Sequence, residues 1–340
     1  MKVLTCVLVG IILISGAFVR IDQYRKNMIS QDGLLELKHL QNKKLSSVLR
    51  NDNFYGDHTS FPGEFILHYV PIKLLGWFDN RIHIDVGGRK ITGIEKHDIT
   101  FLAIPKIILS IAGITLFVLM AKNLSHGVIV ALLMYSFNAH LIYHFLDVRP
   151  YAVLPEFAII SLYLASKPRK KLTALHAVFI VFVSLYHAYG PLIAILPILC
   201  QKFVDKDTKI PYIPIIIGLL GWAYYASYST FGMVPNETQT IVSPFESMPR
   251  ANLVYVIVAT LFGNQLLMMC VLPFVFVKLS DRKFFGEFVI LVVLPILLIC
   301  LVDIKTNYRI HGRQFVWVMP WFALLCGRAM DTFQPPARPQ

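Results

Sequence analysis

Charged side chains are scarce in this chain. Asp, Glu, Lys and Arg make up 15% of the 340 residues, whereas hydrophobic residues make up 56%. A water-soluble domain carries about 25% charged residues. A charge placed in an apolar interior is expensive unless it is paired, so a chain that faces lipid keeps few of them. The deficit excludes an ordinary soluble domain and predicts an integral, multi-pass membrane protein.

Several other signals are also missing. The sequence has neither a Walker-type nor a dinucleotide-binding fingerprint, and we find no internal repeat. The five cysteines have no paired spacing that would predict a disulfide framework or a metal site. The net charge is +12, but Lys and Arg fall mainly in short loops rather than on one soluble face. We therefore expect no nucleic-acid partner, because membrane topology explains the basicity more simply.

Apolar runs dominate the sequence. The first covers 3–19, and nine more follow at about 101–121, 125–146, 150–166, 172–189, 190–204, 210–230, 252–277, 285–303 and 315–330. Their lengths predict about ten transmembrane helices. The expected fold is an all-α polytopic membrane protein in which residues 1–340 form a single membrane domain, with no soluble C-terminal domain. The first run has an alternative interpretation as a signal peptide, because Ser15-Gly16-Ala17 resembles a cleavage site.

A polar insert, residues 21–100, separates the first apolar run from the rest at 101–330. Leucines at helical spacing over 34–49, and an apolar stretch over 65–77, predict amphipathic helices that lie on the membrane surface. A small packed domain is the alternative. We expect this insert to be an extracytoplasmic loop.

Charge supports that orientation. If the insert is outside and the helices alternate, the short turns assigned to the cytoplasm hold Lys122 and the basic residues over 167–171, 202–209 and 278–283. The opposite turns hold Asp147 with Arg149, the Tyr186–Tyr189 segment, and Arg309 with Arg313. The rule thus predicts that these arginine- and aromatic-bearing turns lie on the same side as the insert.

Within the insert, Asp32, Asp57 and His58 are candidates for chemistry. A carboxylate at a bilayer surface can act as a general base, bind a divalent cation, or simply be solvated. Asp22 is an alternative base nearer the first helix. The spacing of these residues fits no established set of metal ligands, so no metal site is predicted, although a divalent cation is possible.

Ionisable residues also occur inside or beside the apolar runs. His140, His144 and Asp147 are spaced to share one helical stripe, and Arg149 and Glu156 follow. Ionisable side chains inside a membrane are energetically costly, so we take a functional role as the first hypothesis for these residues. The alternative is that these ionisable side chains pair with one another and only fix the packing of the helices. A zinc site formed by His140, His144 and Asp147 is a further alternative.

These motifs, in this order, resemble the GT-C superfamily of integral membrane glycosyltransferases, in particular protein O-mannosyltransferases and bacterial aminoarabinose transferases. The resemblance is carried by five segments spread over the chain: Ser30-Gln31-Asp32, Asp57 to Pro62, Asp147 to Tyr151, Tyr186 to Gly190, and Arg313 to Phe315 before Pro320. The sequence departs from the family where Gly33 replaces a second acidic residue, and where Thr59 follows His58.

The resemblance implies an inverting glycosyltransferase that uses a polyprenyl-phosphate sugar donor on the extracytoplasmic face, with a glycan, lipid or protein acceptor. It implies that Asp32 is the base and that Asp57 and His58 orient it. The substrate-binding residues would be Arg149, Tyr151, His187, Tyr189 and Arg313. A transporter or flippase for a lipid-linked or anionic substrate is the alternative from another class. Another lipid-linked transferase, such as an O-antigen ligase or a membrane acyltransferase, is a second alternative.

Overall fold

A computed structural model describes most of the chain. The described residues are 2–26, 40, 44–50, 62–74, 83–85, 90–92, 96–122, 124, 127–145, 150–166, 174–227, 257–258, 260–263, 265–306 and 312–331. In these ranges the chain is helical, with one exception. The strands β1 (His83–Asp85) and β2 (Lys90–Thr92) pair antiparallel, with Ile84 opposite Ile91. The all-α prediction missed this pair, which lies within the polar insert.

The helices follow the predicted apolar runs closely. In chain order they are α1 (Lys2–Lys26), α3 (Leu45–Arg50), α4 (Pro62–Leu74), α5 (Lys96–Ala121), α6 (Gly127–Phe137), α7 (Ala139–Tyr143), the 3-10 helix η1 (Pro150–Ala152), α8 (Leu154–Ser166), α9 (Ala174–Ser184), α10 (Gly190–Val204), α11 (Tyr212–Ser227), α13 (Gln265–Lys278), α14 (Arg282–Phe288), the π-helix η3 (Val289–Val293), α15 (Leu294–Thr306), the 3-10 helix η4 (Gly312–Phe315) and α16 (Met319–Asp331). Because α1 ends at Lys26 and α5 begins at Lys96, both reach into the range expected to be loop.

Three helical stretches are long and apolar enough to cross a membrane by length and composition: 4–23, 103–121 and 282–301. The other apolar helices are shorter, at 10 to 17 residues, whereas a bilayer core requires about 20. The described residues thus give a membrane protein with three clear candidate spans, and the predicted count of ten is not established.

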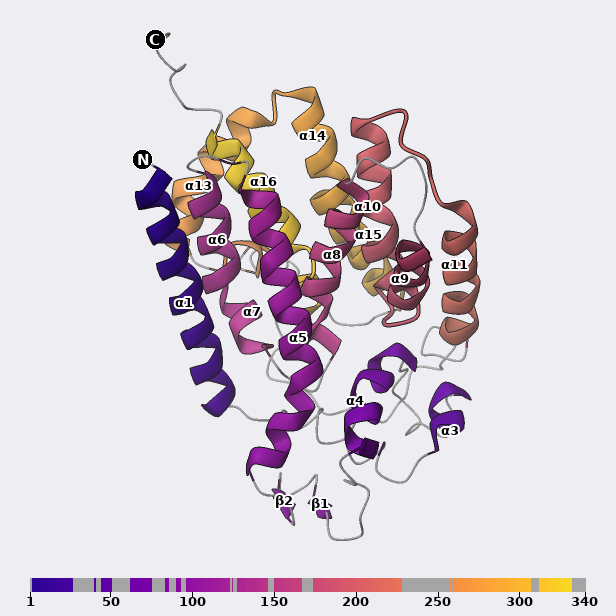
Figure 1. The fold of residues 1–340 in the computed structure, drawn as a ribbon. Helices are drawn as coiled ribbons and strands as arrows, with labels where there is room; N and C mark the ends of the chain where they lie inside the picture. The colour runs from indigo at the N-terminus through magenta and orange to yellow at the C-terminus, as the bar shows by residue number, and fades with distance from the viewer. Residues whose placement is uncertain are drawn as a thin grey trace.

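The elements are arranged as a bundle with the polar insert at one end (Figure 1). α1 and α5 run along one side of the bundle and descend toward the insert, where α3, α4, β1 and β2 lie. At the opposite end are the beginning of α1, the beginning of α14 and the end of α16. The closest helix neighbours are α6 with α16, α9 with α11, α5 with α8, and α1 with α6.

A buried break divides the region expected to form one helix over 125–146. Asn138 accepts hydrogen bonds from the backbone N–H groups of His140 (3.0 Å) and Leu141 (3.1 Å), so it ends α6 and caps α7. Its amide nitrogen donates to the carbonyl oxygen of Thr260 at 2.8 Å. Next to Thr260 in space, Gly263 has φ +61°, and a Cβ there would lie 2.4 Å from the Asn138 amide nitrogen. The prediction of a single helix was wrong, and the break is hydrogen-bonded within the bundle.

α16 occupies the centre of the bundle. Residues 314–327 are buried, including the fully enclosed Trp317 and Trp321. α16 and α6 approach each other closely through Gly127 and Gly327, because a Cβ on Gly127 would lie 2.0 Å from the carbonyl oxygen of Gly327. The backbone N–H of Gly127 also donates to the Asp331 carboxylate at 2.7 Å. Small residues at a crossing allow such contact between helices in a membrane.

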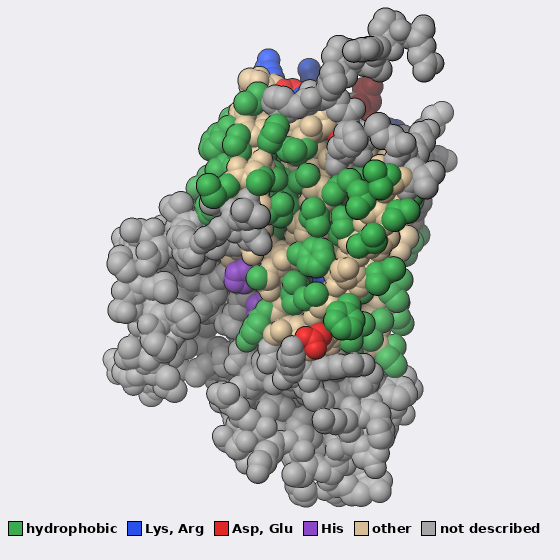
Figure 2. All heavy atoms as spheres, turned by 90° about the vertical axis from the view of Figure 1, so that its left-hand side faces the viewer, with side chains coloured by type: hydrophobic (Ala, Val, Ile, Leu, Met, Phe, Trp, Pro, Cys, Tyr) green, Lys and Arg blue, Asp and Glu red, His purple; other side chains and the backbone are tan. Residues whose placement is uncertain are grey.

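The surface divides into an apolar belt and a charged end. Figure 2 shows the face that includes α1, where hydrophobic side chains cover the middle of the molecule and the visible Lys and Arg side chains gather mainly at the upper end. Exposed apolar residues include Ile14 and Phe18 of α1 and Ile213 and Leu220 of α11. An apolar belt of this kind is expected of a surface that faces lipid.

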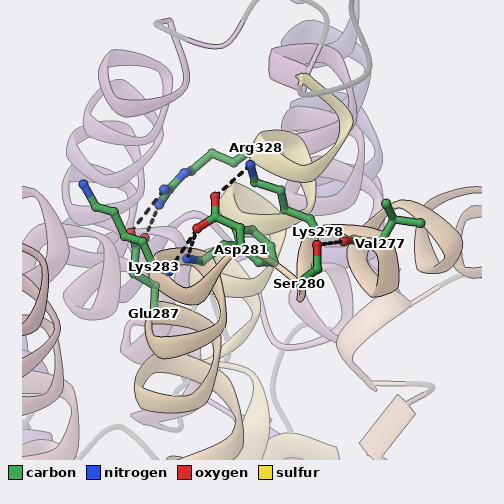
Figure 3. Close-up of polar contacts among 8 residues, drawn as sticks. Val277, Lys278, Ser280, Asp281, Lys283, Glu287 and Arg328 are labelled. Atoms are coloured by element: carbon green, nitrogen blue, oxygen red, sulfur yellow. Dashed lines mark hydrogen bonds and ion pairs between the residues drawn. The ribbon is translucent and has the colours of Figure 1, made fainter.

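The charged end is held together by paired side chains around α14 (Figure 3). Arg328 of α16 forms a two-pronged ion pair with the buried Glu287 carboxylate of α14. Asp281 caps α14 by accepting hydrogen bonds from the backbone N–H groups of Lys283 and Phe284, and its carboxylate lies 2.9 Å from the Lys278 ammonium. These contacts fix the turn between α13 and α14.

Candidate functional site

Several predicted site residues lie outside the described residues. These are Asp32, Asp57 and His58 of the insert, together with Asp147 and Arg149. Arg313 belongs to η4, which places its backbone between α15 and α16. The roles proposed for these six residues remain predictions.

Three other predicted residues come together in space. Tyr151 lies in η1, directly before α8, whereas His187 and Tyr189 lie in the turn that joins α9 to α10. The ring centroids of Tyr151 and His187 are 5.6 Å apart, and those of His187 and Tyr189 are 4.9 Å apart. Segments about 36 residues apart in the chain thus form one contact, at a spacing typical of packed aromatic rings.

The contact extends at both ends into a continuous row. His144 packs on Tyr151 with ring centroids 5.9 Å apart, and Trp317 stacks on Tyr189 at 6.1 Å with an angle of 28° between the rings. We call these five residues, His144, Tyr151, His187, Tyr189 and Trp317, the aromatic row. Sequence reasoning missed Trp317, although the residue lies two positions after the Arg313-Gln314-Phe315 segment that it singled out.

Two polar atoms of the row have defined surroundings. The backbone N–H of Tyr189 donates to Nδ1 of His187 at 3.2 Å, which assigns the remaining ring proton of a neutral imidazole to Nε2. The indole N–H of Trp317 is buried and has no hydrogen-bond partner among the described residues. Buried aromatic faces with a few polar groups are what a binding site for a partly apolar ligand requires.

The insert packs directly on this turn. The backbone N–H of Gly63, in the first turn of α4, donates to the carbonyl oxygen of Leu185 at 3.3 Å. A Cβ on Gly63 would lie 2.5 Å from the Cα of Tyr186, so only glycine allows this approach. On another side, the indole N–H of Trp222 donates to the carbonyl oxygen of Ala188 at 3.0 Å. The helix that begins four residues after His58 therefore lies against the turn that carries His187.

A cluster of three buried side chains, Arg20, Tyr135 and Glu156, connects α1, α6 and α8. An Arg20 nitrogen donates to the backbone carbonyl of Tyr135 at 2.7 Å, and the guanidinium lies over the Tyr135 and Phe145 rings. The Tyr135 hydroxyl donates to the Glu156 carboxylate, 2.9 Å from each oxygen. The sequence singled out Glu156 as an acid in an apolar run, but Arg20 was treated only as the end of a helix. Its position just past seventeen apolar residues was the available signal.

Of the predicted histidine stripe, the structure describes His140 and His144. α7 ends at Tyr143, and His144 caps it through its backbone N–H, which bonds to the His140 carbonyl oxygen at 3.0 Å. The His140 ring instead lies beside Thr260, with Nε2 and Oγ1 3.4 Å apart. Among the described residues, no group of three or more His, Cys, Asp or Glu side chains is arranged to hold a metal ion. Asp147, the third member of the stripe, lies outside them.

The aromatic row and the helix α4 that packs beside it thus form the best-supported candidate site in the described part of the chain. Comparison of the sequence with protein-family models gives no match, and searches of curated proteins and of solved structures likewise find nothing similar.

Proposed function

We propose that this protein is a multi-pass membrane glycosyltransferase that moves a sugar from a polyprenyl-phosphate donor to a hydroxyl acceptor on the extracytoplasmic face. The observation that carries the proposal is the aromatic row, which joins Tyr151, His187 and Tyr189 beside the insert helix α4. These are the residues that the resemblance to GT-C enzymes assigns to the sugar site. Their proximity was not implied by the spacing of the motifs.

The proposed chemistry is a single displacement. The acceptor oxygen attacks the anomeric carbon from the side opposite the phosphate, the carbon–oxygen bond to the phosphate breaks with its electron pair, and configuration inverts. Asp32 takes the hydroxyl proton, since a carboxylate beside an apolar interface is a stronger base than one in water. Arg149 and Arg313 stabilise the charge that grows on the departing phosphate.

The aromatic row supplies binding in this scheme. Sugar rings have apolar C–H faces that fit the face of an aromatic ring, and Tyr189 is a member of the row whose ring is only partly buried. The apolar belt supports the second half of the donor, because a polyprenyl chain needs a lipid-like path to the site.

The decisive experiment incubates purified protein with a panel of radiolabelled polyprenyl-phosphate sugars and membrane extract. We expect transfer or slow hydrolysis of one donor, which would also identify the sugar. Asp32→Asn should abolish transfer while leaving donor binding intact, because it keeps the size of the side chain and removes the base. Full turnover by this variant would move the role to Asp22 or Asp57.

The row itself is tested with a matched pair of variants. Tyr189→Ala removes a ring from the row, whereas Tyr212→Ala removes an exposed ring at the start of α11 that lies outside the row. We expect donor affinity to fall about 10-fold or more in the first variant and to stay unchanged in the second. Equal affinity in both variants would exclude the row as the sugar site.

Transport of a lipid-linked or anionic substrate is a second candidate, favoured by the buried helix break at Asn138. Transporters often bind their substrates where helices are interrupted inside the membrane. The same panel of polyprenyl-phosphate sugars distinguishes a transporter from a glycosyltransferase. A transporter would move the intact lipid between leaflets of a reconstituted vesicle and release no free polyprenyl phosphate.

A further inference from the structure

The buried contact among Arg20, Tyr135 and Glu156 joins helices that are distant in sequence. The three side chains are at most 3% exposed. Tyr135 uses two groups, because its backbone carbonyl accepts from Arg20 while its hydroxyl donates to both oxygens of Glu156. The hydroxyl lies 2.9 Å from both oxygens, so the Glu156 carboxyl group is the acceptor in this contact. We call these three residues the buried charge network.

α5 is shaped around this network. A Cβ on Gly113 would lie 1.9 Å from a Glu156 oxygen, so the carboxylate sits against bare backbone. Ser110 and the buried Lys106 lie on the same side of α5, about one and two turns nearer the polar insert. Three helices, α5, α6 and α8, therefore meet at the carboxylate, and α1 joins them through the contact of Arg20 with Tyr135. Isolated charges in such surroundings are very unfavourable, so the electrostatic attraction between Arg20 and Glu156, which Tyr135 bridges, constrains the geometry.

The network joins the helices that lead to the two parts of the proposed site. Arg20 is six residues before the end of α1, from which the insert carrying Asp32 departs. Its guanidinium also lies over Phe145, which follows His144 of the aromatic row. Glu156 is in the first turn of α8, five residues after Tyr151. The network thus connects the helix that delivers the proposed base to the helix that follows Tyr151.

From this geometry we infer that Arg20, Tyr135 and Glu156 are positioning residues that fix the end of α1, and with it the start of the insert, relative to the aromatic row. The activity readout of this inference rests on the proposed glycosyltransferase function, but its structural readout does not. A network that served only to stabilise the fold would be replaceable by apolar side chains of similar size. A positioning network is not replaceable in this way.

The test compares single and double apolar variants. Arg20→Met or Glu156→Met alone leaves one buried charge unpaired and should lower Tm by about 5–10 °C. The double variant removes both charges and should recover most of that loss. We expect its kcat to remain about 100-fold below wild type with KM for the donor within about twofold, because misplaced groups slow the reaction without weakening binding. Wild-type kcat in a double variant of recovered Tm would overturn the inference.

A distance measurement tests the inference without activity. In a cysteine-free background, spin labels at Ile21 of α1 and Ser166 of α8, both exposed, should give a narrow distance distribution in the wild type and a broadened one in the double variant. A control pair at Ser166 and Leu220, which does not involve α1, should be unchanged. An unchanged Ile21–Ser166 distribution would refute the inference. If no donor reacts with the wild type yet the distribution broadens, the glycosyltransferase proposal fails and the positioning role stands.

Tyr135→Phe keeps the test informative if the charge variants do not fold. It removes the hydroxyl between the two charges and leaves both in place, and we expect the same broadening at smaller amplitude. Arg20→Lys should give an intermediate result, since it retains the charge but not the planar guanidinium over the two rings. Unchanged distances in both variants would again overturn the positioning role.

Discussion

At the scale of single residues, glycine decides where polar groups fit inside this bundle. Gly113 and Gly10 are both helical glycines, yet their surroundings are opposite. A Cβ on Gly113 would overlap the Glu156 carboxylate at 1.9 Å, whereas a Cβ on Gly10 would meet nothing within 4 Å. The two positions therefore separate the effect of close packing from the general effect of glycine in a helix.

Gly113→Ala should destabilise the protein by about 1–3 kcal/mol, because the added methyl forces the carboxylate away from Tyr135. Gly10→Ala should be neutral or stabilising by up to about 1 kcal/mol, since alanine is the better helix former. Thermal unfolding of both variants in one detergent provides the comparison. Equal effects at the two positions would show that Glu156 does not occupy this place.

Asp281 provides a pH-dependent contribution to stability. The Lys278 ammonium, and then the backbone N–H groups of Phe284 and Lys283, hold the pKa of its carboxyl below the ordinary value. A lowered folded-state pKa means that the stabilisation is present above the unfolded-state value, about 3.9, and is lost as pH falls through the folded-state pKa. Asp281→Asn keeps a capping oxygen but no charge, so its Tm should fall less than that of the wild type between pH 5 and pH 3. Parallel Tm curves for the two proteins would contradict this assignment.

The residues that sequence could identify are those whose chemistry stands out locally. Tyr151, His187 and Tyr189 were predicted from short motifs at the ends of apolar runs, and Glu156 from its place in one. Arg20 and Trp317 were missed because their importance comes from partners far away in the chain. The carbonyl that Arg20 contacts is 115 residues distant, and no pattern in a single sequence encodes that pairing.

At the scale of elements, the packing of α4 on the turn before α10 is one contact that ties the insert to the bundle, beside the packing of α4 on α5. It depends on one glycine, because the neighbour of Gly63 is the backbone of Tyr186, which cannot move aside. Gly221 is a useful contrast, since a Cβ there would meet only the flexible side chain of Leu185.

Gly63→Ala should separate α4 from the turn and break the hydrogen bond from Gly63 to Leu185. We expect faster amide hydrogen exchange over 62–74 and over 185–189, and little change in the remaining helices. Gly221→Ala should leave both segments as they are in the wild type. Unaltered exchange in Gly63→Ala would mean that α4 is held by other contacts.

Element boundaries were partly predictable. Apolar runs located the helices well, because burial and lipid contact require them wherever they occur. They did not reveal the break at Asn138, since the flanking residues are apolar on both sides and the cap depends on Thr260 and Gly263 from another part of the chain. The β1–β2 pair was missed for a related reason, as three-residue strands carry too short a pattern to recognise.

At the scale of the whole molecule, charge and polarity predict an orientation. The insert elements lie at one end of the bundle, and the paired basic residues around α14 lie at the other (Figure 1). We expect the basic end to face the cytoplasm, as positively charged turns generally do.

Cysteine labelling of intact cells tests this orientation in a cysteine-free background. Val70→Cys, on exposed α4, should react with a membrane-impermeant maleimide from outside, whereas Lys206→Cys, on the exposed turn after α10, should react only after permeabilisation. The reverse pattern would place the aromatic row and the proposed sugar site on the cytoplasmic side, where the proposed reaction does not occur.

The central position of α16 has a consequence for how the protein is made. Every other described helix precedes α16 in the chain. The ribosome therefore synthesises the central helix after the helices that surround it. Until α16 emerges, the face of α6 around Gly127 has no partner, and neither does Glu287. The earlier helices therefore lack these contacts until the last helix of the bundle has been synthesised. The native packing around the axis can be completed only at the end of synthesis.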